Sequence, residues 1–137
     1  MTTANPHRLS DALRACACGI RPLEAGTGLL IDCRSWLHRE DFTSRFIEAG
    51  TSISDGISPM AAIDWDAAIT ALNGGDLPCS GGERRILQLS ASLAAGTPVS
   101  LRDTITGLDD RNTTLLITAI QHAAGNYSLA DDRSRLR

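Results

Sequence analysis

Cys79 has sequence neighbours that could activate a thiol. It directly precedes Ser80-Gly81-Gly82-Glu83, whose residue types are those of a helix N-terminus. The unpaired amides and the dipole at such an end favour negative charge and lower the pKa of a nearby thiol. The glycines leave those amides uncovered, so residues 77–83 could also bind an anion. This hypothesis places a thiol or anion site at Cys79, Ser80, Gly81 and Gly82.

The same residues also have a purely structural explanation. Ser80 and Glu83 have the spacing of a capping box, in which each side chain accepts a hydrogen bond from the other residue's amide. A cysteine enzyme also needs a base, and none of the three histidines stands in a motif with a cysteine. We therefore favour a capped helix with a packed Cys79, and we assign no catalytic residue.

Cys16-Ala17-Cys18 invites a metal-binding interpretation. On a helix, however, residues two positions apart point to opposite sides, so these two thiols cannot hold one ion. The Cys-x₂-Cys pairs typical of zinc sites and iron–sulfur clusters are missing from the sequence. We expect four free thiols, no metal and no cofactor, as is usual in the reduced cytoplasm.

Residues 100–124 have the outline of a helix-turn-helix, with a short helix from Ser100, a turn at Gly107-Leu108 and a longer helix from Asp109. In a DNA-binding regulator, the longer helix would read the duplex. Against this, Asp109-Asp110 would face phosphate, and the net charge of −3 disfavours nucleic acid. The candidate DNA-contact residues of this alternative are Arg102, Arg111, Asn112 and Thr113.

The composition is that of one globular domain. Of 137 residues, 42% are hydrophobic and 21% charged, which is close to the globular average. We expect a single domain over residues 1–125 and a frayed tail over residues 126–137. All 13 basic residues are arginine, which indicates a GC-rich genome with few lysine codons rather than selection for anion contacts.

No segment has the pattern of a secretory signal or a membrane span. Residues 1–19 lack an uninterrupted apolar core, and no stretch approaches 18 apolar residues without charge. We therefore expect a cytoplasmic protein without membrane contact.

Apolar side chains recur at helical spacing along most of the chain, between recognisable start and stop residues. No strand is expected, although Ile53 and Ile57 in the predicted loop 51–59 would allow a short extended piece. The pattern predicts an all-α, irregular orthogonal bundle of about six to seven short helices. The expected helices span residues 6–19, 22–31, 40–49, 64–73, 80–96, 100–107 and 109–125, with Trp36-Leu37 as a buried linker.

Three segments together resemble a family of small helical proteins of actinobacteria: Leu77-Pro78-Cys79-Ser80-Gly81-Gly82-Glu83, Leu101-Arg102-Asp103 and Gly107-Leu108-Asp109-Asp110-Arg111-Asn112. The resemblance covers mainly residues 60–125. It agrees with a GC-rich source, and it implies no activity and no catalytic residue.

The polar residues that stand out are thus explained mainly by helix ends and turns. We therefore expect a non-catalytic protein-interaction or regulatory module that acts through a helical surface, with self-association or a protein partner. The helix-turn-helix regulator and the site at residues 77–83 remain the alternatives.

Overall fold

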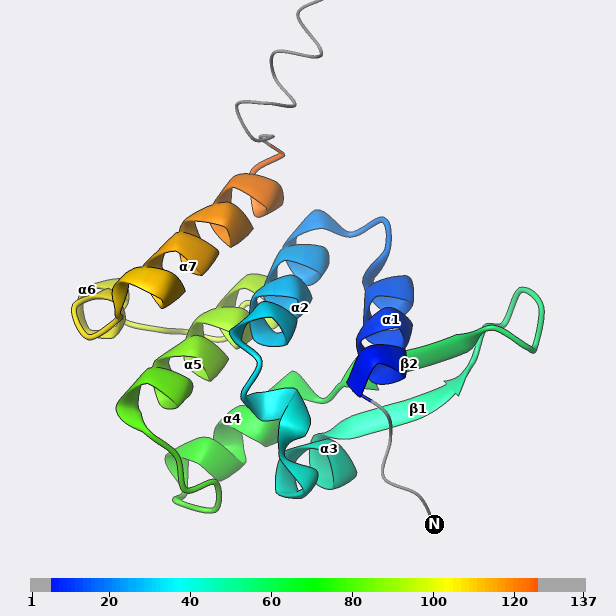
Figure 1. Cartoon of the computed structure of the whole chain (residues 1–137), viewed down its shortest axis with the longest axis horizontal. Coiled ribbons are helices and arrows are strands. Elements are labelled where there is room, and N and C mark those ends of the chain that lie inside the picture. Colours follow the sequence, from blue (N-terminus) through cyan, green and yellow to red (C-terminus); the bar gives the residue numbers. More distant parts are fainter. Residues whose placement is uncertain (1–5, 126–137) are drawn as a thin grey trace, which may run out of the picture.

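Helices dominate the part of the chain that the structure, a computed structural model, describes, which is residues 6–125 (Figure 1). The prediction of a mainly helical bundle is confirmed. The tail expected over residues 126–137 lies outside the described residues. The elements are α1 (Pro6–Ala17), α2 (Arg21–Cys33), the 3-10 helix η1 (Trp36–His38), α3 (Glu40–Phe46), β1 (Ile47–Thr51), β2 (Pro59–Ile63), α4 (Trp65–Asn73), α5 (Gly81–Ala95), α6 (Leu101–Ile105) and α7 (Asp110–Ala123).

The last four helices begin where their capping residues predict. Asp64 accepts a hydrogen bond from the Ala67 amide at 3.1 Å, and Asp109 accepts one from the Asn112 amide at 2.7 Å. Ser80 and Ser100 cap α5 and α6 in the same way. Each cap pairs an amide that the helix itself leaves without a partner, which fixes the starting residue.

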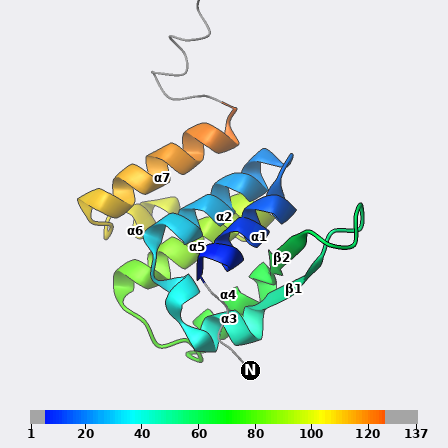
Figure 2. The same ribbon diagram turned by 45° about the vertical axis from the view of Figure 1, so that its right-hand side comes forward.

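The helix expected over residues 40–49 is wrong in its last three residues. The helix ends at Phe46, and β1 pairs with β2 in an antiparallel hairpin that projects from the bundle (Figures 1 and 2). Packing of β2 against α1 stabilises the strand, because Ala61 and Ile63 are buried while Ala62 between them is exposed. Tertiary contact has overridden the local helical pattern.

α2 lies at the centre of the bundle and packs against α1, α5 and α7 (Figure 2). A Cβ at Gly26 would lie only 2.7 Å from Ala94 Cβ, so α2 and α5 approach each other closely. Trp36, predicted to be buried, is fully buried, and its indole Nε1 donates to the Glu83 carbonyl at 2.9 Å. α5 and α7 cover two sides of α2. The side of α2 that stays accessible faces the space between α1 and α7.

Within residues 6–125, no helix is both long and apolar enough to cross a bilayer.

Candidate functional site

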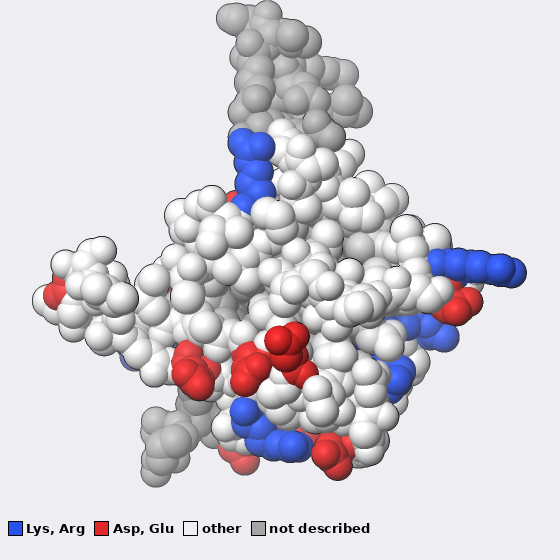
Figure 3. All heavy atoms as spheres, turned by 180° about the vertical axis from the view of Figure 1, so that it is seen from behind, with Lys and Arg blue, Asp and Glu red and all other residues white. Residues whose placement is uncertain are grey.

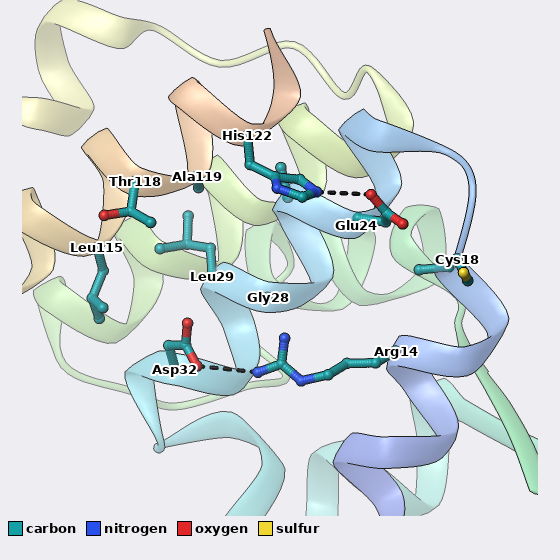
Figure 4. Close-up of a pocket in the computed structure, with 12 residues that line it drawn as sticks. Arg14, Cys18, Glu24, Gly28, Leu29, Asp32, Leu115, Thr118, Ala119 and His122 are labelled. Atoms are coloured by element: carbon teal, nitrogen blue, oxygen red, sulfur yellow. Dashed lines mark hydrogen bonds and ion pairs between the residues drawn. The ribbon is translucent and has the colours of Figure 1, made fainter. Parts of the chain in front are cut away.

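A groove runs along α2 between α1 and α7 (Figure 4). Its volume of about 350 Å³ is near the lower end of the range for small-molecule pockets. Two consecutive helices, α1 and α2, and the distant helix α7 therefore form one hollow. The residues that line it are Arg14, Ala17, Cys18, Glu24, Ala25, Gly28, Leu29, Asp32, Leu115, Thr118, Ala119 and His122.

Small residues on the facing helices keep this groove open. Ala17, Ala25 and Ala119 line it, and Gly28 contributes no side chain at all. A Cβ at Gly28 would have one neighbouring atom within 4 Å, Arg14 Nη1 at 3.6 Å, which is ordinary contact. Packing between helices therefore does not require a glycine at this position.

One ion pair and one histidine–carboxylate contact cross the groove. Arg14 Nη2 of α1 lies 3.2 Å from Asp32 Oδ1 of α2, and both side chains are half exposed. His122 Nε2 of α7 lies 2.7 Å from Glu24 Oε1 of α2. In Figure 4 the two pairs lie at separate places along α2, with Gly28 and Leu29 between them. Exposed pairs of this kind contribute little to stability and can rearrange around a ligand.

Glu24 joins three parts of the groove. The Gly19 amide in the α1–α2 turn donates to Glu24 Oε2 at 2.9 Å, while Oε1 contacts His122. The hydrogen bond from Gly19, followed by that to His122, lowers the pKa of Glu24 below its ordinary value. Hydrogen bonds of this kind favour the charged form, so Glu24 is an anion at neutral pH with both oxygens engaged.

The candidate site at residues 77–83 has the geometry of a cap. The Ser80 amide donates to Glu83 Oε1 at 2.9 Å, and the Glu83 amide donates to Ser80 Oγ at 3.1 Å. The Arg85 side chain lies against Gly81, because a Cβ at this glycine would be 2.8 Å from Arg85 Nη1. Gly82 follows in the same first turn. The Glu83 carboxylate thus already supplies negative charge at this helix end.

Cys79 is half-buried at the same turn. Burial, and next the charge of Glu83, raise the pKa of the Cys79 thiol. This direction is opposite to the one that a thiolate nucleophile requires. In the described part of the chain, no group of three or more His, Cys, Asp and Glu side chains is placed to hold a metal ion.

The four candidate DNA-contact residues do not share one free surface. Arg111 Nη2 donates to the Asp32 carbonyl at 2.7 Å, so this guanidinium caps the C-terminal end of α2. Asn112 is half-buried at the start of α7, with its side-chain oxygen out of contact with solvent. Arg102 and Thr113 are exposed, and the Thr113 hydroxyl donates to the Asp109 carbonyl.

Acidic and arginine side chains are interspersed on the face seen from behind (Figure 3). Between them lie large uncharged areas, and the described residues of that face form no continuous basic surface. A duplex would need such a surface to neutralise its phosphates.

Uncharged side chains are exposed along one flank of α7 and its C-cap, which we call the α7 stripe: Thr113, Ile117, Ile120 and Ala124. Ile117 is 52% exposed and Ile120 is 44% exposed. At about 100° per residue, the stripe lies on the flank of α7 away from the groove, with the buried Leu116 and Ala119 between the two. The stripe and the groove are therefore separate surfaces.

α6 adds two further exposed aliphatic side chains, Leu101 and Ile105, with exposed fractions of 53% and 42%. This short helix lies beside the first turns of α7 in both ribbon views (Figures 1 and 2). Among the described residues, the large exposed hydrophobic side chains thus lie on the last two helices, in the loop of the hairpin (Ile53 and Ile57) and, at Ile20, in the turn between α1 and α2.

No family model, curated protein or solved structure matches the chain. The groove and the stripe are therefore interpreted from their geometry and chemistry.

Sequence reasoning did not assign the groove to a site, because the residues of its α7 wall lie far along the chain from those of α1 and α2. Glu24 and His122 are separated by 98 positions. A signal is present in retrospect: Glu24, Gly28 and Asp32 follow one another at four-residue spacing, which places them on one face of α2.

Proposed function

We propose that the protein is a non-catalytic interaction module that associates with a second copy of itself through the α7 stripe. The exposure of Ile117 and Ile120 on one helix flank is the observation that supports this proposal. Contiguous apolar surface of this kind is typical of a protein contact site. Four free cysteines fit the reducing cytoplasm, where we expect the module to act.

The stripe carries no formal charge. From residue 112 to residue 125 the sequence contains no Asp, Glu, Lys or Arg. The centres of protein interfaces are depleted in charged residues, and homodimer interfaces are the more apolar class. Two identical copies would therefore meet here without placing like charges against each other.

The spacing within the stripe suits antiparallel pairing. Positions 113, 117, 120 and 124 are separated by four, three and four residues, the spacing of a coiled-coil seam. This order reads the same in both directions. A two-fold axis would therefore place Ile117 against Ile120 of the second copy, as an isologous interface requires.

Charge at the two ends of α7 favours the same arrangement. Asp109 and Asp110 are exposed at its N-terminal end, whereas the Arg21 guanidinium lies against Gly125 at its C-terminal end. In an antiparallel pair, Asp109 and Asp110 of one copy approach Arg21 of the other, while Arg111 and Glu24 beside them reduce the difference in charge between the two ends. The helix dipoles are also aligned favourably in this orientation.

Sedimentation equilibrium of the full chain over a range of concentrations tests the proposal. We expect a reversible dimer, and we expect Ile117→Glu or Ile120→Glu to weaken it about tenfold or more, because each places a charge in an apolar contact. Gln121→Glu adds the same charge at an exposed position of α7 outside the stripe, and it should leave the dimer intact. A wild-type chain that is monomeric at every concentration would refute the proposal.

A further inference from the structure

A second pocket lies between α5 and the segment that leads into α6. Its volume of about 400 Å³ is within the range for small-molecule pockets. From α5 it is lined by Gly81, Arg84, Arg85 and Gln88, which have the spacing of one helix face. Pro98 and Val99 contribute apolar surface from the segment before α6. This pocket shares no residue with the groove along α2.

Two glycines leave room for the Arg85 guanidinium beside this pocket. A Cβ at Gly81 would lie 2.8 Å from Arg85 Nη1, and a Cβ at Gly107 would lie 2.6 Å from Arg85 Nη2 and overlap its Cζ. Neither glycine has a left-handed φ, so the backbone conformation does not require glycine at either position. The place taken by the guanidinium accounts for both residues.

Arg85 is held in this position without an anionic partner. Its Nη1 donates to the Gly107 carbonyl in a long hydrogen bond of 3.5 Å, and no carboxylate among residues 6–125 forms an ion pair with it. A guanidinium has five N–H donors, so most of those of Arg85 are free for a ligand in the pocket that it lines. Because the side chain is half-buried, its unpaired charge is costly, which points to an anion as the missing partner.

The other charged residues that line the pocket are Arg84 and Asp103. Arg84 donates to the Leu72 carbonyl and to the Asn73 side chain, each at 3.2 Å, and these neutral groups do not cancel its charge. Asp103 is exposed, and its carboxylate accepts a hydrogen bond from the Ser100 hydroxyl at 3.1 Å. The lining therefore has one positive charge in excess.

Charged residues next to the pocket along the chain do not reverse this excess. Glu83 and Asp109 each accept an amide hydrogen bond at a helix start, so their charge is already directed to a cap. Arg102 and Asp110 are exposed and of opposite charge, and they offset each other.

We infer that this pocket binds a small organic carboxylate, with its two oxygens on the Arg85 guanidinium and its apolar body against Pro98 and Val99. A guanidinium and a carboxylate match in two parallel hydrogen bonds, and one negative charge balances the excess. The α5 amides take no part, because Ser80 and Glu83 already cap that helix end. No residue of α7 lines the pocket, so the inference does not depend on self-association.

Butyrate is a suitable probe, with 1-butanol as the neutral match and inorganic phosphate as the other class of oxyanion. At constant ionic strength, we expect butyrate to shift the NMR signals of the Arg85 Nε–H and the Val99 amide in the ¹⁵N-labelled full chain, saturably. 1-Butanol should bind about tenfold more weakly, because the charge-assisted hydrogen bonds are lost. Shifts that never saturate would overturn the inference, as would phosphate binding as tightly as butyrate, because phosphate lacks the apolar body.

Two variants test Arg85 and its position. Arg85→Gln removes the charge and should weaken butyrate binding about tenfold, whereas Arg8→Gln, at an exposed position of α1, should leave it unchanged. Gly107→Ala keeps the charge but displaces the guanidinium, so it should weaken binding about threefold. Gly50→Ala, where the added methyl group meets open space, is its control and should bind normally. The amide spectrum shows directly whether each variant is folded, and undiminished binding by folded Arg85→Gln would contradict the inference.

Discussion

A methyl group added at Gly26 meets different surroundings from one added at Gly28. At Gly26 it lies 2.8 Å from the Ala94 amide nitrogen, in the contact between α2 and α5, whereas at Gly28 it enters the groove. We predict that Gly26→Ala destabilises the protein by about 1–3 kcal/mol through overpacking. Gly28→Ala should stabilise it by up to about 1 kcal/mol through helix propensity. Urea denaturation followed by circular dichroism measures both free energies of unfolding.

Changes of opposite sign in the free energy of unfolding would show that Gly26 is packed against α5 whereas Gly28 faces open space. Destabilisation by Gly28→Ala would mean that the groove is filled at this position. An unchanged free energy of unfolding in Gly26→Ala would mean that α2 and α5 lie further apart.

Asp55 organises the loop between β1 and β2. Its carboxylate accepts hydrogen bonds from the amides of Ile57 and Ser58, at 2.8 and 2.9 Å, and from the Ser58 hydroxyl. These hydrogen bonds lower the pKa of Asp55 to about 2, and the bond from the Ser58 hydroxyl makes the largest contribution. We predict a midpoint of about 2 when its side-chain carboxyl is titrated by ¹³C NMR. Ser58→Ala should raise that midpoint.

This result depends on the loop keeping its shape in solution. A wild-type midpoint at the ordinary value of 3.8 would show that the three hydrogen bonds to Asp55 do not persist. Stability is not the readout here, because the carboxylate is fully exposed.

At the scale of elements, helix starts were predictable because a cap is a local interaction. Ser80 and Glu83 are three residues apart, and their reciprocal bonds need nothing from the rest of the fold. The hairpin was not predictable in this way. The outward residue between Ala61 and Ile63 is Ala62, so the burial of β2 alternates without any alternation of polar and apolar residue types.

The capping box of α5 has a measurable contribution. Ser80→Ala removes the oxygen that accepts from the Glu83 amide, and we predict a loss of about 1 kcal/mol in the free energy of unfolding. Ser44→Ala, at an exposed position inside α3, is the matched control and should change stability little. Equal effects of the two substitutions, measured by urea denaturation, would argue against a stabilising cap.

At the scale of the whole molecule, the groove shows where sequence reasoning stops. Each of its helices was predicted, yet nothing local indicated that α7 would lie beside α2. Arg111 was considered as a DNA contact because it stands at the front of α7, but the fold turns it onto the Asp32 carbonyl. The role of Arg111 depends on the C-terminal end of α2 lying within its reach, and tertiary packing determines that position.

The contact between Glu24 and His122 connects α2 with α7 and should make stability depend on pH. The hydrogen bond from the Gly19 amide and then that to His122 lower the pKa of Glu24 below 4.5 in the folded protein. A group whose pKa is lower in the folded state stabilises the fold above its unfolded pKa. That contribution is lost as the pH falls through the folded pKa.

Glu24→Gln tests this linkage, because glutamine keeps an oxygen for the Gly19 amide but cannot ionise. We predict that the wild type exceeds Glu24→Gln in stability at neutral pH, and that the difference shrinks steadily as the pH falls below 4.5. His122→Ala removes the hydrogen bond and the charge of His122 but leaves the Gly19 amide, the largest cause of the shift, so it should retain part of the pH dependence. Urea denaturation of all three proteins across this range measures the effect. A difference between wild type and Glu24→Gln that stays constant with pH would show that Glu24 titrates alike in the folded and unfolded chains.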